Sequence, residues 1–261
     1  MAEKTRVDQL LVKKGLVDDL NTARRLVMAG KVRASGQLVQ QPSSPVSSNA
    51  ELSIEQGPQY VSRAGVKLAA LLDKFSIKID GRVCADVGAS TGGFTDCLLQ
   101  RGAERVYAVD VGYGILDWSL RQDERVVVME RTNVRYLDSL PQPVSFVSVD
   151  VSFISLELIF PVVKNWFSPA GGELGVLIKP QFEASRAEAA RGEGVIQDPE
   201  IHRRVLWEIL TGARKEGYQT RGLMTSPLPG QEGNREFLAW LRWNQEEVSS
   251  PEPDQLIADL F

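Results

Sequence analysis

The chain has 261 residues, of which 43% are hydrophobic and 25% charged, enough apolar material for one sizeable core and a smaller module. It contains no apolar run of the roughly 18 residues that a membrane span requires, and its start, MAEKTRVDQLL, lacks the pattern of a secretory signal, so we expect a cytoplasmic protein. The net charge is −4, and Cys84 and Cys97 have no C-x-x-C spacing, which favours two buried, reduced thiols over a metal site or a disulfide.

The charge is unevenly distributed along the chain. Residues 1–60 carry eight Lys or Arg against six acids, a net charge of +2, so the remainder must carry −6. Screening confines the field of such charges to about 8–10 Å. We therefore expect a polyanionic partner to meet local basic patches and not a generally attractive surface.

The first part of the chain, residues 1–59, is expected to be a small α+β module. VDQLLVKKG repeats apolar residues at helical spacing before Gly15, and DLNTARRLVMAG predicts a second helix that is capped by Asn21 and ends at Gly30. Two short strands around Ser35-Gly36 follow, and NAELSIE predicts another.

The stretch RVDQLLVKKGLVDDLNTARRLVMAGKVRASGQLV resembles the S-four-type RNA-binding module and covers most of this part. Basic side chains on the second helix and on the strand after it are close enough in sequence to share one face. The charge pattern alone leaves open a solvated basic helix face. The candidate RNA-binding residues are Lys13, Lys14, Arg24, Arg25, Lys31 and Arg33, with Arg63 beyond the module.

The second part, residues 60–243, alternates strand and helix patterns, which predicts an α/β fold with a doubly wound, mainly parallel sheet. Residues 60–75 predict a helix whose apolar face points to the core. Seven segments have strand patterns: RVCADVG, RVYAVDVG, RVVVME, FVSVDVSF, GELGVLIKP, YQTRGLMTSPL and REFLAWLRW. Residues 244–261 form an acidic, Pro-containing tail that is expected to be flexible.

The loop DVGASTGGFT, residues 86–95, joins the first of these strands to a helix, the place where the backbone of a parallel sheet approaches a ligand. Its D-x-G-x-x-x-G-G spacing differs from the dinucleotide fingerprint G-x-G-x-x-G. A carboxylate at the strand end repels a phosphate and suits a cationic ligand such as S-adenosyl-L-methionine. The loop residues expected to hold this cofactor are Asp86, Gly88, Ser90, Thr91, Gly92, Gly93 and Phe94.

Three further residues are candidates for the same ligand: Asp110, Asn133 and Asp150. Asp110 ends the next strand, where a carboxylate can accept hydrogen bonds from both ribose hydroxyls of a nucleoside. The alternative for Asp110 is a surface carboxylate at a strand end. Asn133 follows the third strand and is expected to face the adenine.

Asp150 and Lys179 each lie near the carboxyl end of an apolar strand. Burial of either charge alone is unfavourable by several kcal/mol, so each is expected to have a partner or a function. An inter-strand salt bridge would satisfy both side chains without any chemistry. The strand pattern leaves that alternative as open as catalysis.

Six segments, in this order, resemble the TlyA family of ribosomal RNA 2′-O-methyltransferases: YVSRAGVKL, DVGASTGGFT, VSVDVSFIS, LIKPQFE, RGEGVIQDPEIH and GNREFL. The resemblance runs over nearly all of residues 1–243. It implies a Rossmann-like, seven-stranded methyltransferase sheet in residues 60–243. It also implies S-adenosyl-L-methionine as cofactor, ribosomal RNA or ribosomal subunits as partner, and a cytidine ribose 2′-hydroxyl as the methylated group.

The resemblance further implies that Lys67, Asp150, Lys179 and Glu236 form the Lys-Asp-Lys-Glu catalytic tetrad of that family. A ribose hydroxyl is a poor nucleophile, so its proton must leave during or near methyl transfer. We expect Lys179 to act as the base, Asp150 to orient it, and the other pair to position the ribose, with no metal required. Ala64 stands where the family is expected to have glycine.

The sequence leaves several alternatives open. Residues 183–199 are either a lid over the ribose or an ordinary connection. His202, the only histidine, is expected at a helix surface or cap. A non-catalytic RNA-binding assembly factor with the same fold, and a cytolysin, as the family's historical name hemolysin implies, are the competing functions, and a nicotinamide-dependent dehydrogenase is disfavoured by the aspartate-led loop.

Overall fold

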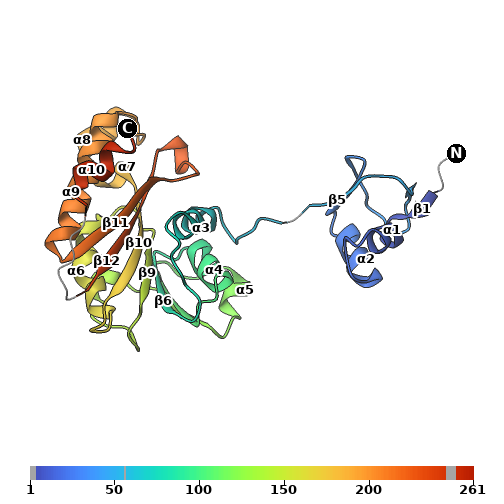
Figure 1. The fold of residues 1–261 in the computed structure, drawn as a ribbon, viewed down its shortest axis with the longest axis horizontal. Coiled ribbons are helices and arrows are strands. Elements are labelled where there is room, and N and C mark those ends of the chain that lie inside the picture. Colours follow the sequence, from blue (N-terminus) through green and yellow to red (C-terminus); the bar gives the residue numbers. More distant parts are fainter. Residues whose placement is uncertain (1–3, 56, 245–250) are drawn as a thin grey trace. The chain divides into compact units, whose positions relative to one another are not determined.

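The computed structural model describes residues 4–55, 57–244 and 251–261, which fold as two compact units, Met1–Gln59 and Tyr60–Phe261 (Figure 1). Each unit has its own apolar core. Cys84 and Cys97 are buried and free, as predicted.

The first unit is the small α+β fold that the sequence predicts. Helices α1 (Val7–Lys13) and α2 (Leu20–Met28) pack on each other over a core that includes Leu11 and Val27. Three short strands form an antiparallel sheet in the order β3-β2-β5, and two more pair with each other. The strands are β1 (Lys4–Arg6), β2 (Val32–Ala34), β3 (Gln37–Leu38), β4 (Pro45–Ser47) and β5 (Leu52–Ile54).

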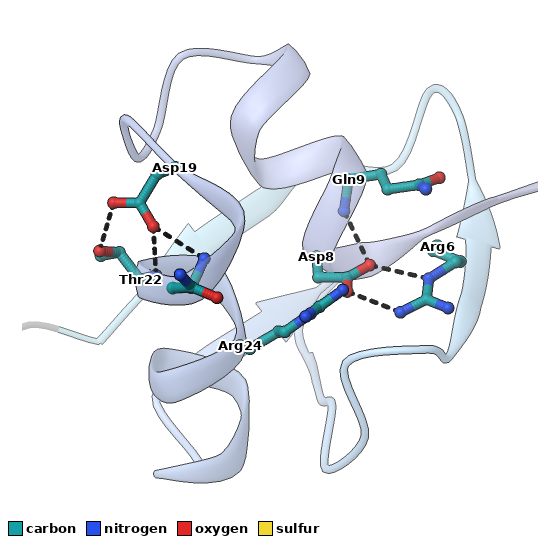
Figure 2. A network of polar contacts seen from close by, with 7 residues as sticks. Arg6, Asp8, Gln9, Asp19, Thr22 and Arg24 are labelled. Carbon is teal, nitrogen blue, oxygen red and sulfur yellow. Dashed lines mark hydrogen bonds and ion pairs between the residues drawn. The ribbon is translucent and has the colours of Figure 1, made fainter.

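The cap of α2 differs from the prediction. Asp19 caps this helix: its Oδ1 accepts hydrogen bonds from the backbone N–H groups of Asn21 and Thr22 at 2.7 and 2.9 Å, and the Thr22 hydroxyl donates to Oδ2 at 2.8 Å (Figure 2). The prediction of Asn21 as the cap is wrong, because Asp19 is the last residue with extended backbone and Asn21 already lies in the helix.

The second unit contains a seven-stranded sheet in the order β11-β12-β10-β9-β6-β7-β8. Neighbouring strands from β10 to β8 are parallel, and β12 is antiparallel to both of its neighbours. All seven predicted strands and the mainly parallel sheet are confirmed. The strands are β6 (Val83–Val87), β7 (Arg105–Val109), β8 (Val126–Met129), β9 (Phe146–Val149), β10 (Gly172–Ile178), β11 (Tyr218–Thr225) and β12 (Phe237–Trp243).

Helices cover both faces of this sheet (Figure 1). One face packs against α3 (Ala64–Lys74), α4 (Gly93–Gln100) and α5 (Trp118–Arg121). The other packs against α6 (Phe160–Val163) and α9 (Pro199–Lys215). Short helices lie in the connections: η1 (Val134–Tyr136), η2 (Leu156–Leu158), η3 (Lys164–Trp166), α7 (Pro180–Glu183), α8 (Arg186–Arg191) and η4 (Gln231–Gly233).

The segment after β12 is not the flexible tail that its composition predicts, as far as the structure describes it. Helix α10 (Pro253–Ala258) packs on α9, and Ile257 is buried in the core of the second unit. The segment is acidic overall, but burial of its few apolar side chains against the second unit favours an ordered helix. Residues 245–250, also part of the expected tail, lie outside the described residues.

Candidate active site

The loop between β6 and α4 brings two strand ends together. Gly88 has φ +80°, and a Cβ there would lie 2.3 Å from the backbone oxygen of Asp150, at the end of β9. Only glycine allows so close a contact in that conformation. Gly92 has φ +97°, and a Cβ there would collide with Leu120 of α5. These two glycines are therefore required by the packing of the loop against its own protein.

Asp86 is fully buried and bonded within the unit. Its Oδ2 accepts hydrogen bonds from the backbone N–H and the hydroxyl of Thr95 at 2.8 and 2.7 Å, and its Oδ1 accepts one from the Ser148 hydroxyl at 3.0 Å. Burial raises the pKa of this carboxyl to about 7. Asp86 therefore fastens the loop to α4 and β9, and its expected contact with a cationic ligand stays a prediction.

A cavity of about 400 Å³ lies at the carboxyl ends of β6, β7 and β9. Of the predicted cofactor residues, Gly88, Ser90, Asp110, Asn133 and Asp150 line it. The others do not, although they were predicted to bind the same ligand: Asp86, Thr91, Gly92, Gly93 and Phe94. Phe94 is instead buried in the apolar core against α3.

Asp110 is held rigidly at the wall of this cavity. Its Oδ2 accepts a hydrogen bond from the backbone N–H of Ser90 at 2.8 Å, and its Oδ1 accepts one from that of Gly112 at 2.6 Å. Asn133 caps η1, accepting a hydrogen bond from the N–H of Arg135 at 3.1 Å. Both side chains line the cavity, and their contacts with a ribose and an adenine stay predictions.

A larger cavity of about 940 Å³ is lined by all four residues of the predicted tetrad. Lys67 lies on α3, Asp150 follows β9, Lys179 follows β10, and Glu236 precedes β12. Four elements that are far apart in the sequence therefore supply one site. Asp150 and its neighbours Ser152 and Phe153 line both cavities, so the two cavities share a wall at the end of β9.

The four charged side chains form two ion pairs. Lys67 Nζ lies 2.5 Å from Glu236 Oε2, and both side chains are almost completely buried. Lys179 Nζ lies 2.6 Å from Asp150 Oδ1 and donates a hydrogen bond to the Ser152 hydroxyl at 3.2 Å. The salt bridge considered for Asp150 and Lys179 is present, and it lies in a cavity wall, where a substrate can reach it.

Phe153 is a cavity residue that the sequence analysis missed. Its side chain is 89% exposed, its φ is +62°, and its ring centroid lies 4.7 Å from that of Phe182. An exposed aromatic ring on a strained backbone is a feature of ligand sites. The available signal was its position three residues after Asp150.

Two amide side chains of the larger cavity were also missed. Gln181 donates a hydrogen bond to Glu236 Oε1 at 3.4 Å. Asn234 donates to the backbone oxygen of Gly194 and accepts from the N–H of Ile196, both at 3.0 Å. Both amides belong to segments that the sequence analysis singled out, KPQFE and GNREFL, but only contacts between distant segments show what they hold.

The connection from residue 183 to 199 is partly helical and reaches the larger cavity. Ser185 and Glu188 form a capping box at the start of α8. Gly194 lines the cavity and is tied down by Asn234. Closure of residues 183–199 over the ribose, as a lid, stays a prediction.

His202 is buried, so its predicted position at a helix surface or cap is wrong. It lies in α9, whose cap is Asp198. Its Nε2 lies 3.0 Å from the backbone oxygen of Ile196, and its ring packs against Phe237. Burial lowers the pKa of the imidazole, so the neutral ring donates from Nε2.

The predicted RNA-binding residues differ in how free their charges are. In the first unit, Arg24 Nε lies 3.3 Å from Asp8 Oδ2, and Arg33 is paired with Glu55. The remaining basic candidates of that unit have exposed side chains: Lys13, Lys14, Arg25 and Lys31. Arg63, in the second unit, lines the larger cavity and donates a hydrogen bond to the backbone oxygen of Pro229. Ala64 begins α3, a position that accepts a Cβ.

Comparison with known proteins agrees with both units. Residues 60–243 match the family of FtsJ-like methyltransferases, and residues 5–52 match the S4 domain. YqxC of Bacillus subtilis, provisionally named a ribosomal RNA methyltransferase, is 44% identical over 97% of this chain and 92% of its own length. TlyA of Mycobacterium tuberculosis, named a 16S/23S rRNA (cytidine-2′-O)-methyltransferase, is 42% identical over 96% of this chain and 94% of its own.

A solved structure from Streptococcus thermophilus with a provisional hemolysin name is 40% identical. It has a TM-score of 0.72 and covers 99% of this chain and 96% of its own. Family, sequence and structure matches thus extend over both units. The chain belongs to the FtsJ-like methyltransferase family, in the TlyA group that joins an S4 domain to a methyltransferase domain.

Proposed function

We propose that the chain transfers a methyl group from S-adenosyl-L-methionine to the ribose 2′-hydroxyl of a cytidine in ribosomal RNA. The observation that carries the proposal is the shared wall of the two cavities at Asp150. A methyl donor in the smaller cavity and a ribose in the larger one would meet beside the Lys179–Asp150 pair. The cytidine and the ribosomal RNA are taken from the named function of the relative from M. tuberculosis.

The smaller cavity favours a nucleoside with a cationic end over a dinucleotide. A pyrophosphate is held by free backbone N–H groups of the glycine loop. Here the N–H groups of Gly88 and Ala89 donate to the backbone oxygen of Val109 at 2.9 and 3.2 Å, and that of Ser90 donates to Asp110. The carboxyl of Asp86 does not line this cavity, so the preference rests on these bonded N–H groups.

When bound, S-adenosyl-L-methionine supplies a methyl group on a sulfonium that becomes a neutral thioether. Lys179 is the group proposed to take the proton from the 2′-hydroxyl as the new C–O bond forms and the bond from the methyl carbon to sulfur breaks. Asp150 fixes the position of Lys179 Nζ, and the Lys67–Glu236 pair holds the ribose. Orientation of two reactants in this way can remove on the order of 7–11 kcal/mol from a barrier.

Phe153 and Phe182 support entry of one nucleotide into the larger cavity. Their rings lie side by side at its wall, and Phe153 is almost fully exposed. Enzymes that modify a nucleotide in structured RNA lift it out of its stack and place its base against aromatic side chains. We propose that the base of the target nucleotide stacks on Phe153.

The hemolysin name of some relatives describes a competing function. No helix in the described part of this chain is long and apolar enough to cross a membrane. An assembly factor that binds RNA without modifying it is the other competitor. The ion pairs in the larger cavity favour the enzyme, because burying charged groups costs folding free energy and catalysis gives a reason to keep them there.

The test is incubation of the full chain with radiolabelled S-adenosyl-L-methionine and either separated ribosomal subunits or deproteinised ribosomal RNA. We expect label in RNA, on the ribose of a cytidine, found by nuclease digestion and chromatography of the nucleosides. Label on a base would refute the ribose assignment. No label on either RNA form, despite tight RNA binding, would leave the assembly factor as the function.

A further inference from the structure

Asp8 is a fully buried carboxylate in the first turn of α1 that holds two arginine side chains (Figure 2). Arg6 binds it through one edge of its guanidinium, with Nε donating to Oδ1 at 3.0 Å and Nη2 donating to Oδ2 at 2.8 Å. Arg24, from α2, donates from Nε to Oδ2 at 3.3 Å. The backbone N–H of Gln9 donates to Oδ1 at 2.9 Å and fixes the carboxylate itself.

The two arginines keep donors for a further ligand. Their side chains are 44% and 48% exposed, whereas that of Asp8 is not exposed at all. Asp8 engages only one edge of each guanidinium, and within the described residues Arg6 Nη1 and both Nη atoms of Arg24 make no hydrogen bond. Two positive charges against one negative leave the cluster with a net charge of +1.

A purely structural role explains this cluster poorly. A buried carboxylate is costly, and an apolar side chain of similar size would fill the same space at least as well. The Arg33–Glu55 pair of the same unit shows the ordinary arrangement, in which both partners are half-exposed and the charge is cancelled. The Asp8 cluster instead fixes two guanidinium groups at the surface without cancelling their charge.

Two fixed guanidinium groups match the geometry of a phosphate. Arginine binds phosphate oxygens through two parallel N–H groups, and affinity is lost when the side chains must first be ordered. We propose that Asp8 is a positioning residue that pre-organises Arg6 and Arg24 to bind one backbone phosphate of the RNA. This inference rests on RNA being the substrate, as in the proposed function, and adds which charges bind it and what orders them.

The test uses Asp8→Asn in the full chain, with binding to deproteinised ribosomal RNA measured by filter retention over a range of salt concentrations. The substitution removes a negative charge, so general electrostatic attraction predicts tighter binding. Pre-organisation predicts the opposite: a dissociation constant raised about fivefold to tenfold, and a slope of log affinity against log salt reduced by about one phosphate contact. Unchanged or tighter binding with an unchanged slope refutes the inference.

Asp19→Asn is the matched control. It also changes a carboxylate to an amide in the first unit and contacts neither Arg6 nor Arg24. It should bind RNA as tightly as the unchanged chain or slightly more tightly. Weakening by both variants to the same extent would show that loss of any acid in this unit disturbs binding, which contradicts a specific role for Asp8.

A second variant keeps the test valid if Asp8→Asn unfolds the unit, which circular dichroism would show. Arg6→Lys combined with Arg24→Lys preserves the charge and removes both forks. We expect weaker RNA binding, a raised KM for RNA, and an unchanged kcat at saturating RNA. An unchanged KM refutes the inference. If the unchanged chain itself neither binds nor methylates RNA, the proposed function fails, which is a separate outcome.

Discussion

Three aspartates of this chain show how the surroundings of a carboxyl decide its role. Asp86 is buried among hydroxyl and amide donors, and its pKa is raised because desolvation outweighs these hydrogen bonds. Asp8 is equally buried, but the hydrogen bonds from the Arg6 guanidinium lower the pKa of its carboxyl. Asp150 is paired with Lys179 in a cavity wall. The sequence presents all three as aspartates beside apolar residues.

Asp86→Asn is expected to change how stability depends on pH. The folded pKa of about 7 exceeds the unfolded value of 3.8, so the folded state binds more protons between these values. Unfolding free energy therefore falls as pH rises from about 4 to about 7, and this loss should disappear in the variant. The amide can still accept from Thr95 and donate to Ser148.

Urea unfolding of both proteins at pH 4, 5, 6, 7 and 8 measures this prediction. The stability of the variant relative to the unchanged chain should increase up to pH 7 and then level off. A constant difference over the whole range would show that the Asp86 carboxyl does not titrate in this window.

Lys179→Ala is expected to retain the cofactor and to lose methyl transfer. Lys179 is not part of the smaller cavity, so binding of S-adenosyl-L-methionine, measured by calorimetry, should change less than about threefold. Loss of a proton acceptor typically costs 10²–10⁴-fold in rate, so single-turnover transfer should fall by about that factor. Lys164→Ala is the matched control, since it removes a lysine paired with Glu216 away from both cavities. Normal turnover by Lys179→Ala would remove this amine from the mechanism.

At the scale of the elements, the connections after β10 and between β11 and β12 help to set the position of Glu236 in the predicted tetrad. The connection from β11 to β12 carries Glu236 at its end, and Gly230 lies against that side chain. The connection after β10 carries Gln181, which bonds to the same carboxylate. The geometry of the Lys67–Glu236 pair thus depends on two loops as well as on the sheet.

Gly230→Ala should disturb the Lys67–Glu236 pair although neither charged residue is substituted. A Cβ at this position would lie 2.1 Å from Glu236 Oε1, so the carboxylate must move relative to Lys67. We expect kcat to fall at least about tenfold, because small misplacements in a reactive geometry are costly, while cofactor binding stays unchanged. Gly233→Ala, in the same loop, has φ +86° and open space around it, so it strains the backbone without contacting Glu236 and controls for disturbance of the loop alone. Equal kcat values for both variants would contradict the prediction.

Much of the element scale was predictable from the sequence. All seven strands of the sheet were recognised, because Val-rich runs bounded by glycines and charges are a local signal. The start of α3 was placed four residues early, and the cap of α2 two residues late. Both errors concern the ends of helices, where a single side-chain contact decides the boundary.

For the whole molecule, two units with separate cores are expected to unfold separately, and only one contains the predicted cofactor residues. S-adenosyl-L-methionine at about 100 times its dissociation constant should stabilise that unit by about 2.7 kcal/mol. This corresponds to about 5–10 °C in Tm for a unit of this size.

Differential scanning calorimetry measures this effect. The transition of residues 60–261 should move upward and that of residues 1–59 should not, and NAD at the same concentration should move neither. A comparable shift with NAD would contradict the assignment of the smaller cavity.

The sequence by itself determined the strands, the order of the two units, and the set of polar residues at strand ends, since periodicity and motif spacing are local properties. It also indicated that Asp150 and Lys179 would be close, because parallel strands end at one edge of a sheet. Only the tertiary structure decided which polar side chains line a cavity and which are buried. Asp86 is buried against Thr95 and Ser148, His202 is buried in the core, and α10 packs on α9. Those outcomes depend on burial and on partners distant in the chain, and neither is written in the local pattern of residues.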